Sequence, residues 1–169
     1  FTAEDGFGGN NSMNSFNLFA LGGSGAWLYN FALGIDRHER GAGMQRFLLQ
    51  PVAGGSFSFA KGEIETPYGV VRSAWKGDAE RGIVSYACTV PANTEADLYL
   101  PVPQGTRVEL ARKDGAQAQK GPADLRFIGF ARHNGLDTAR FTVPAGRYVF
   151  KREGLTLSAG ISNAKGEEV

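Results

Sequence analysis

The spacing of the hydrophobic residues changes near residue 46, and this change predicts the fold. Between residues 27 and 35, apolar side chains recur three and four positions apart, which is the period of an amphipathic helix. From residue 46 onward, short runs rich in β-branched and aromatic residues alternate between apolar and polar positions. These runs are RFLLQP, SFSFAKGEIE, GVVRSAW, GIVSYACTV, ADLYLPV, TRVELAR, LRFIGFAR, ARFTV and GRYVFKRE. Because no helical pattern lies between them, the sequence predicts a mainly-β fold: an antiparallel β-sandwich, jelly-roll-like, with one N-terminal helix.

The helical segment, residues 15–35, has low helix propensity at its centre. Ser15 and Asn17 are both suitable residues for its N-cap. Three glycines lie between positions 22 and 25, and each costs about 1 kcal/mol relative to alanine in a helix. Such a helix needs either another backbone packed against its glycines or a local distortion, and we do not expect it to stand alone.

Composition and charge exclude several classes of function. The formal net charge is +1 and no basic run occurs, so we expect no nucleic-acid partner. The only sustained apolar segment, residues 16–35, is interrupted by glycines and does not supply the roughly 20 apolar residues that span a bilayer. The single cysteine, Cys88, lies in a strand-like run and is predicted to be a small buried residue.

The polar residues show no complete catalytic or metal site. His38 and His133 have no ligand-type companions at suitable spacing, so we expect solvated turn residues, with no metal and no cofactor. A glycosidase needs two carboxylates that flank one bond. Glu63 and Glu65 point to the same side of one strand, and we interpret them as its solvent face with Ile64 turned inward.

Aromatic residues are the other feature relevant to sugars, because their rings can stack on sugar rings. Core packing is the favoured interpretation for Trp27, on the helix stripe, and core or rim packing for Trp75. The six aromatic candidates are Trp27, Tyr68, Trp75, Tyr86, Tyr99 and Tyr148. Taken alone, these residues describe a β-sandwich with no visible active site.

Several blocks of sequence resemble the bacterial α-L-rhamnosidases of glycoside hydrolase family 78. The blocks keep the order of that family and cover most of residues 4–150. They are EDGFGGNNSMNSFN, FALGGSGAWLYNFALGI, RFLLQPVAGG, IETPYGVVRSAW, VPANTEADLYLPV and VPAGRYVF. The resemblance implies an (α/α)₆ catalytic barrel followed by a β-sandwich, in an enzyme that hydrolyses terminal α-L-rhamnose with inversion.

The resemblance also implies a division of the chain and a set of partners. The expected partners are the parent's own catalytic barrel and, in the full-length protein, a rhamnose-containing glycan. The implied parts are residues 1–14 as a loop from the end of the catalytic domain, 15–35 as the last barrel helix, 36–45 as a connector, 46–154 as the C-terminal β-sandwich domain and 155–169 as a tail.

Two departures from the family pattern concern the active site. The family's base belongs to a Trp-Glu motif that would stand before residue 1, so the resemblance implies no catalytic residue in this chain and no activity of the chain alone. Ser15, Phe16 and Asn17 match the family's S-x-N motif, but Leu18 stands where the family usually has His. Asn17 and Leu18 are therefore the expected substrate-binding positions, at the edge of the parent's cleft.

Three functions remain open at this point. The first is a non-catalytic rhamnosidase portion whose sandwich buttresses the barrel. The second is a carbohydrate-binding module that uses exposed aromatics, and the third is a small hydrolase that uses Glu63 and Glu65. Without the barrel, the apolar stripe of the helix lacks a partner, so we also expect a homodimer through it. The stripe consists of Phe16, Phe19, Trp27, Leu28 and Phe31.

Overall fold

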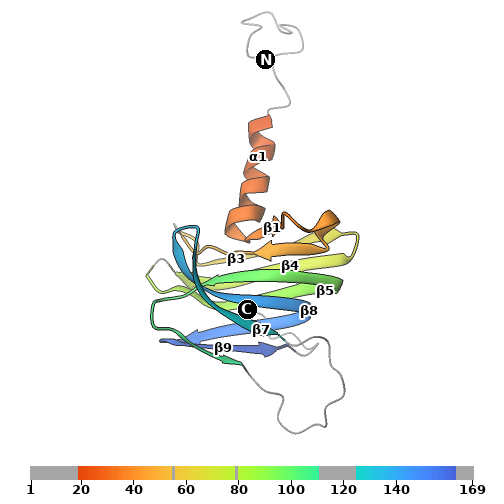
Figure 1. Ribbon diagram of the computed structural model, residues 1–169. Coiled ribbons are helices and arrows are strands. Elements are labelled where there is room, and N and C mark those ends of the chain that lie inside the picture. Colours follow the sequence, from red (N-terminus) through yellow and green to blue (C-terminus); the bar gives the residue numbers. More distant parts are fainter. Residues whose placement is uncertain (1–18, 55, 79, 111–124, 163–169) are drawn as a thin grey trace, which may run out of the picture.

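The computed structural model describes residues 19–54, 56–78, 80–110 and 125–162 as one helical segment on a β-sandwich (Figure 1). The helical segment consists of α1 (Phe19–Trp27) and a π-helical turn (Leu28–Ala32), and a 3₁₀ turn (Ala42–Met44) precedes β2. The strands are β1 (Ile35–Arg37), β2 (Arg46–Leu49), β3 (Phe59–Thr66), β4 (Gly69–Asp78), β5 (Gly82–Pro101), β6 (Arg107–Leu110), β7 (Arg126–His133), β8 (Leu136–Glu153) and β9 (Thr156–Ile161).

Two long strands, β5 and β8, run through both layers of the sandwich. The first half of β5 pairs with β4 and the second half of β8, and β3 and β9 extend this layer on either side, with β6 beside β9. The second half of β5 pairs with β2 and the first half of β8, and β1 and β7 extend the second layer. The register of β5 on β8 shifts between Val90 and Glu95, where Asn93 has a φ of 61°. The two long strands bend there and pass from one layer to the other.

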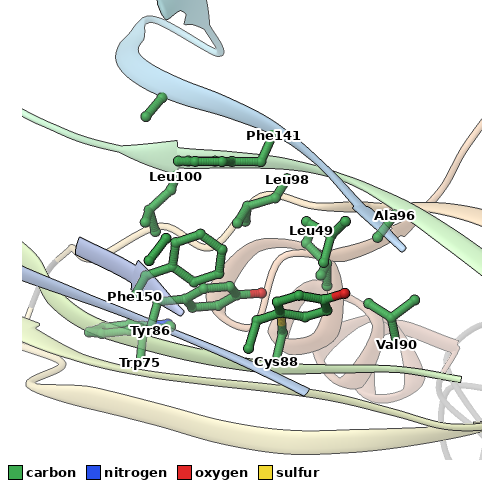
Figure 2. Packing of buried hydrophobic residues seen from close by; sticks show 14 of the residues in the cluster. Leu49, Trp75, Tyr86, Cys88, Val90, Ala96, Leu98, Leu100, Phe141 and Phe150 are labelled. Atoms are coloured by element: carbon green, nitrogen blue, oxygen red, sulfur yellow. The ribbon is translucent and has the colours of Figure 1, made fainter. Parts of the chain in front are cut away.

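The core lies between the inner faces of the two layers (Figure 2). Trp75, Tyr86 and Phe150 come from the first layer, and Leu98 and Phe141 come from the second. The rings of Phe141 and Phe150 meet edge to face at 5.1 Å between centroids, so aromatic contacts join the layers directly.

The predicted fold class is confirmed, with one refinement. Most strand pairs are antiparallel, but β2 pairs with β5 in parallel and β6 pairs with β9 in parallel, so the sheet is mixed. Strand pairing also extends beyond residues 46–154 at both ends. β1 pairs with β2, and β9 pairs with β8 and places Leu157 and Ala159 in the core.

The helix projects away from the sandwich at the edge where β1 and β3 lie (Figure 1). The α-helix continues through the glycine-rich stretch. The helical geometry is distorted after this stretch, in the π-helical turn, where Leu33 N donates to Leu28 O at 3.0 Å. A Cβ built on Gly23 or Gly25 meets no atom within 4 Å. Trp27 is 51% exposed, so the prediction that it packs in the core is wrong for this chain. The helical pattern revealed an apolar face, but the described residues do not supply a cover for it.

Candidate functional site at the joint of helix and sandwich

Two buried side chains of β4 bind the carbonyl groups at the end of the helix. Trp75 Nε1 donates a hydrogen bond of 2.6 Å to Ala32 O, and Ser73 Oγ donates one of 2.6 Å to Leu33 O. The last carbonyls of a helix have no partner within the helix, so a buried helix end needs such donors. Both side chains point into the core, at 1% exposure or less. The helix end is therefore fixed inside the sandwich and does not merely rest on its surface.

Glycines allow the backbones at this joint to approach closely. Gly34 has a φ of 71°, and a Cβ there would collide with the backbone of Gln50 and Pro51. A Cβ on Gly62 of β3 would collide with the side chain of Leu33. Directly after Gly34, Ile35 enters β1 and the core at 1% exposure. The path from helix to sheet thus has little freedom to change direction.

Above the joint, large apolar side chains face outward. Trp27 and Phe31 stack on each other at 6.0 Å between centroids, and both are more than half exposed. Leu28, Phe57 and Phe59 line a neighbouring hollow of about 490 Å³ between the helix and the start of β3. We call these five side chains the aromatic patch. Contiguous exposed apolar surfaces of this kind commonly mark interaction sites.

A second hollow lies on another side of the helix. It has a volume of about 900 Å³ and is lined by Ala26 and Asn30 of the helix, by β1 and by Ile64 to Pro67. The helix therefore stands between two concave surfaces, and both have room for side chains from a neighbouring element.

The carboxylates considered for catalysis lie on the exposed face of β3. Glu63 Oε2 accepts a hydrogen bond of 2.7 Å from Arg72 Nε across the strand pair. Glu65 is also exposed, and Ile64 packs against the core, so the interpretation as a solvent face is confirmed. Two carboxylates on the same face of one strand cannot take opposite sides of one glycosidic bond.

Neither histidine is a solvated turn residue, so this prediction is wrong. His38 Nε2 lies 3.4 Å from Oδ2 of Asp97, a carboxylate at 2% exposure that also accepts bonds of 2.8 to 3.1 Å from Arg46. His133 stacks on Tyr99 at 4.0 Å between centroids, and its Nε2 lies 2.6 Å from Oε1 of Gln50.

Both histidine contacts join residues that lie far apart in the sequence. His38 is 59 positions from Asp97, and His133 is 83 from Gln50. Burial and the Arg140 guanidinium lower the pKa of His133 below its ordinary value. No local sequence signal indicated either partner.

The aromatic residues considered for sugar stacking do not form one exposed strip. Trp75, Tyr86 and Tyr148 lie in the core at 2% exposure or less, which confirms the interpretation of Trp75. Tyr99 is covered by His133 and has the Arg140 guanidinium over its ring at 5.4 Å. The aromatics that the structure does expose gather mainly in the aromatic patch.

Cys88 and the two expected substrate-binding positions complete the set of candidate residues. Cys88 is buried as predicted, and burial raises the pKa of its thiol well above the ordinary value. Asn17 and Leu18 lie outside the described residues. Within the described ranges, no three His, Cys, Asp or Glu side chains gather as metal ligands. In the same part of the chain, no helix is long and apolar enough to cross a membrane.

These observations define a class of protein: a β-sandwich with a helix fixed at its edge. Comparison with known proteins identifies the family. The family described as bacterial alpha-L-rhamnosidase C-terminal domain matches residues 34–115. An α-L-rhamnosidase of Streptomyces avermitilis is 30% identical over 131 residues, and one of Formosa agariphila is 32% identical over 89 residues. The chain belongs to the bacterial α-L-rhamnosidase family, of which it carries the C-terminal domain.

A solved structure supports the fold assignment. The crystal structure of Streptomyces avermitilis α-L-rhamnosidase complexed with L-rhamnose superposes with a TM-score of 0.54 at 24% identity. The match covers 85% of this chain and 12% of that one. By sequence, the chain spans 12% of the Streptomyces relative and 9% of the Formosa relative. It therefore corresponds to a small part of each of these enzymes.

Proposed function

We propose that this chain is the non-catalytic C-terminal portion of an α-L-rhamnosidase, and that its sandwich buttresses the catalytic barrel. In this proposal α1 is the last helix of the barrel and the joint holds it at a fixed angle. The observation that carries the proposal is a contrast along one short segment. Ala32 and Leu33 are bound inside the sandwich, while Trp27, Leu28 and Phe31 point away from it.

The free energy of burying apolar side chains favours a partner that covers the aromatic patch above the joint. A large apolar side chain left in water forfeits roughly 1.5 to 3 kcal/mol of burial free energy. The aromatic patch contains five such side chains, and the hollows beside the helix can accept side chains of neighbouring barrel helices. The open space around Gly23 and Gly25 would in addition let another helix approach the backbone closely.

A carbohydrate-binding role through exposed aromatics has weaker support. Three of the six candidate rings are in the core, and Trp27 belongs to the aromatic patch of the helix. Stacking on a sugar requires an open ring face, which Tyr99 lacks because His133 covers it.

The proposal predicts that the isolated chain does not hydrolyse α-L-rhamnosides. Hydrolysis requires an acid and a base on either side of the glycosidic bond, and Glu63 and Glu65 cannot take these positions. Incubation with an aryl α-L-rhamnoside should release no phenol above the buffer control, while the full-length parent releases it under the same conditions. Turnover by the isolated chain that disappears in Glu63→Gln or Glu65→Gln would contradict the proposal.

We also propose that the isolated chain forms a homodimer through the aromatic patch. With no barrel present, a second copy is the available apolar surface that can cover Trp27 and Phe31. Sedimentation over a wide concentration range should show a monomer–dimer equilibrium. A truncation that begins at Ala32 keeps both carbonyls of the joint and should remain monomeric at every concentration. Monomers for both chains would contradict a dimer through the helix.

A further inference from the structure

Gln50 holds the joint from two sides, through its backbone and through its side chain. Its amide N donates a hydrogen bond of 2.8 Å to Gly34 O, and its carbonyl group occupies the space that a Cβ on Gly34 would need. Its side-chain Nε2 donates a bond of 3.3 Å to Oδ2 of Asp36 in β1. Gln50 therefore contacts the residues immediately before and after Ile35, where the chain passes from the helix into the sheet.

The other end of the Gln50 side-chain amide reaches the hairpin between β7 and β8. Its Oε1 lies 2.6 Å from Nε2 of His133 and accepts a longer bond of 3.4 Å from Nδ2 of Asn134 in the turn. Because Nε2 of Gln50 is engaged with the Asp36 carboxylate, Oε1 is the atom that faces the hairpin. An amide oxygen only accepts, so neutral His133 carries its proton on Nε2 and donates a hydrogen bond to Gln50. One side chain thus ties the hairpin to the joint.

Tyr99 and Arg140 approach His133 from two neighbouring strands. The imidazole stacks on Tyr99 of β5 at 4.0 Å between centroids, and Cζ of Arg140 in β8 lies 5.4 Å from the centroid of the same Tyr99 ring. Nε of Arg140 is buried and has no hydrogen-bond partner among the described residues. In the same part of the chain no carboxylate forms an ion pair with Arg140, and Asp36 of β1 is joined to His133 through the Gln50 amide. A protonated His133 would therefore place two cations on one tyrosine ring.

Protonation of His133 is unfavourable in the folded chain. Burial, and after it the Arg140 guanidinium, lower the pKa of His133 below its ordinary value of 6.5. Both causes vanish in the unfolded chain, so the unfolded state takes up the proton more readily. The stability that neutral His133 contributes is complete above about pH 6.5 and is lost as the pH falls from there through the lowered pKa. The contacts of His133 are thus sensitive to acid.

We propose that Gln50, His133 and Asn134 form an acid-sensitive brace, which ties the β7–β8 hairpin to the joint and opens when His133 takes up a proton. Among the described strands β7 pairs with β8 alone, so the end of this hairpin can move without breaking a second strand pair. In the open state the imidazole leaves Tyr99, which separates the two cations, and Gln50 loses its contact with the hairpin. The inference rests on the proposed function, because the brace would set how firmly the sandwich holds the helix.

Hydrogen exchange of the Gln50 backbone amide in the 169-residue chain tests this proposal, because this amide bonds to Gly34 O within the joint. Exchange is measured at about pH 5 and about pH 7.5, on either side of the ordinary histidine pKa, with the chain monomeric and each rate corrected for the intrinsic chemical rate. Protection of this amide should fall about two- to tenfold at the lower pH, the loss expected for one hydrogen bond. His133→Gln keeps a donor for Gln50 but cannot take up a proton, so its protection should be equal at both pH values.

Two further variants separate the brace from other effects of acid. Arg140→Gln removes the second cation, so protonated His133 should stay in place and protection should change less than about twofold between the two pH values. His38→Gln alters the other histidine, which pairs with Asp97 and lies outside the brace, and should keep the full acid response. An unchanged response in His133→Gln or Arg140→Gln, a lost response in His38→Gln, or no response in the unmodified chain would overturn the proposal. Each of these results concerns the isolated chain without the barrel and leaves the buttress proposal unaffected.

Discussion

Replacement of Gly34 by alanine is expected to lower the free energy of unfolding of this chain by roughly 2 to 4 kcal/mol. Gly34 has a φ of 71°, which side-chain-bearing residues rarely adopt, and a Cβ there would collide with the backbone of Gln50 and Pro51. Backbone atoms cannot move aside as a flexible side chain can, so the joint must shift. Urea unfolding followed by the fluorescence of the buried Trp75 measures the change.

Gly25→Ala is the matched control for this substitution. The chemical change is the same, but a Cβ on Gly25 meets no atom within 4 Å. Alanine there should leave the stability of the isolated chain unchanged or raise it by up to about 1 kcal/mol, through higher helix propensity. Equal losses in the two variants would show that the joint is not a place of close backbone contact.

The second large effect is expected in the full-length parent. Trp27→Ser combined with Phe31→Ser should lower the stability of the catalytic barrel by roughly 6 to 10 kcal/mol, because loss of each buried large aromatic side chain typically costs about 3 to 5 kcal/mol. The same double substitution in the isolated monomer should cost less than about 1 kcal/mol, since both side chains are more than half exposed there. Urea unfolding of the parent and of the isolated chain gives the comparison.

A similar small effect in both contexts would contradict the buttress proposal. It would mean that the aromatic patch remains exposed in the parent and that the barrel does not pack on it. The isolated chain thus serves as the control for the parent, with identical substitutions and the same local sequence.

Strand faces could be predicted from the sequence because alternation is a local property. In β5, the alternation predicts that Val84, Tyr86, Cys88 and Val90 share one face, with Ser85 and Thr89 on the other. The structure buries Tyr86, Cys88 and Val90, but it buries Ile83 in place of Val84, because the register of β4 on β5 shifts between Lys76 and Gly77. For Trp75, at the end of its predicted strand, the sequence favoured core or rim packing, and the structure places it in the core. Each of these inferences needs only the few residues around it.

The length of the two central strands could not be predicted in this way. The sequence indicates separate strands before and after Pro91, and again before and after Pro144, because proline and the nearby polar residues usually end a strand. The structure continues through both points as the bent strands β5 and β8. The bends carry these strands from one layer to the other, which depends on how both layers pack.

The joint itself was missed for a related reason. Ser73 and Trp75 bind carbonyl groups that lie 40 and 43 positions away in the sequence. Gly34 and Gly62 carried a weaker signal, because isolated glycines next to predicted elements often mark close approach of backbones. The exposure of Trp27 was missed because periodicity reveals an apolar face but not the element that covers it.

Hydroxyl-radical footprinting of Trp27 and Phe31 tests the central claim most directly, because it requires no substitution. In the isolated chain, at a concentration where it is monomeric, both residues should be oxidised rapidly, and Trp75 should be protected at its 1% exposure. In the parent, Trp27 and Phe31 should fall to the protection of a buried ring. Ile161 of β9 and Leu155 of the turn before it are exposed, and β9 lies on the far side of the sandwich from the helix (Figure 1), so both residues should react equally in the two proteins. Rapid oxidation of Trp27 and Phe31 in the parent would contradict a sandwich that buttresses the barrel through this helix.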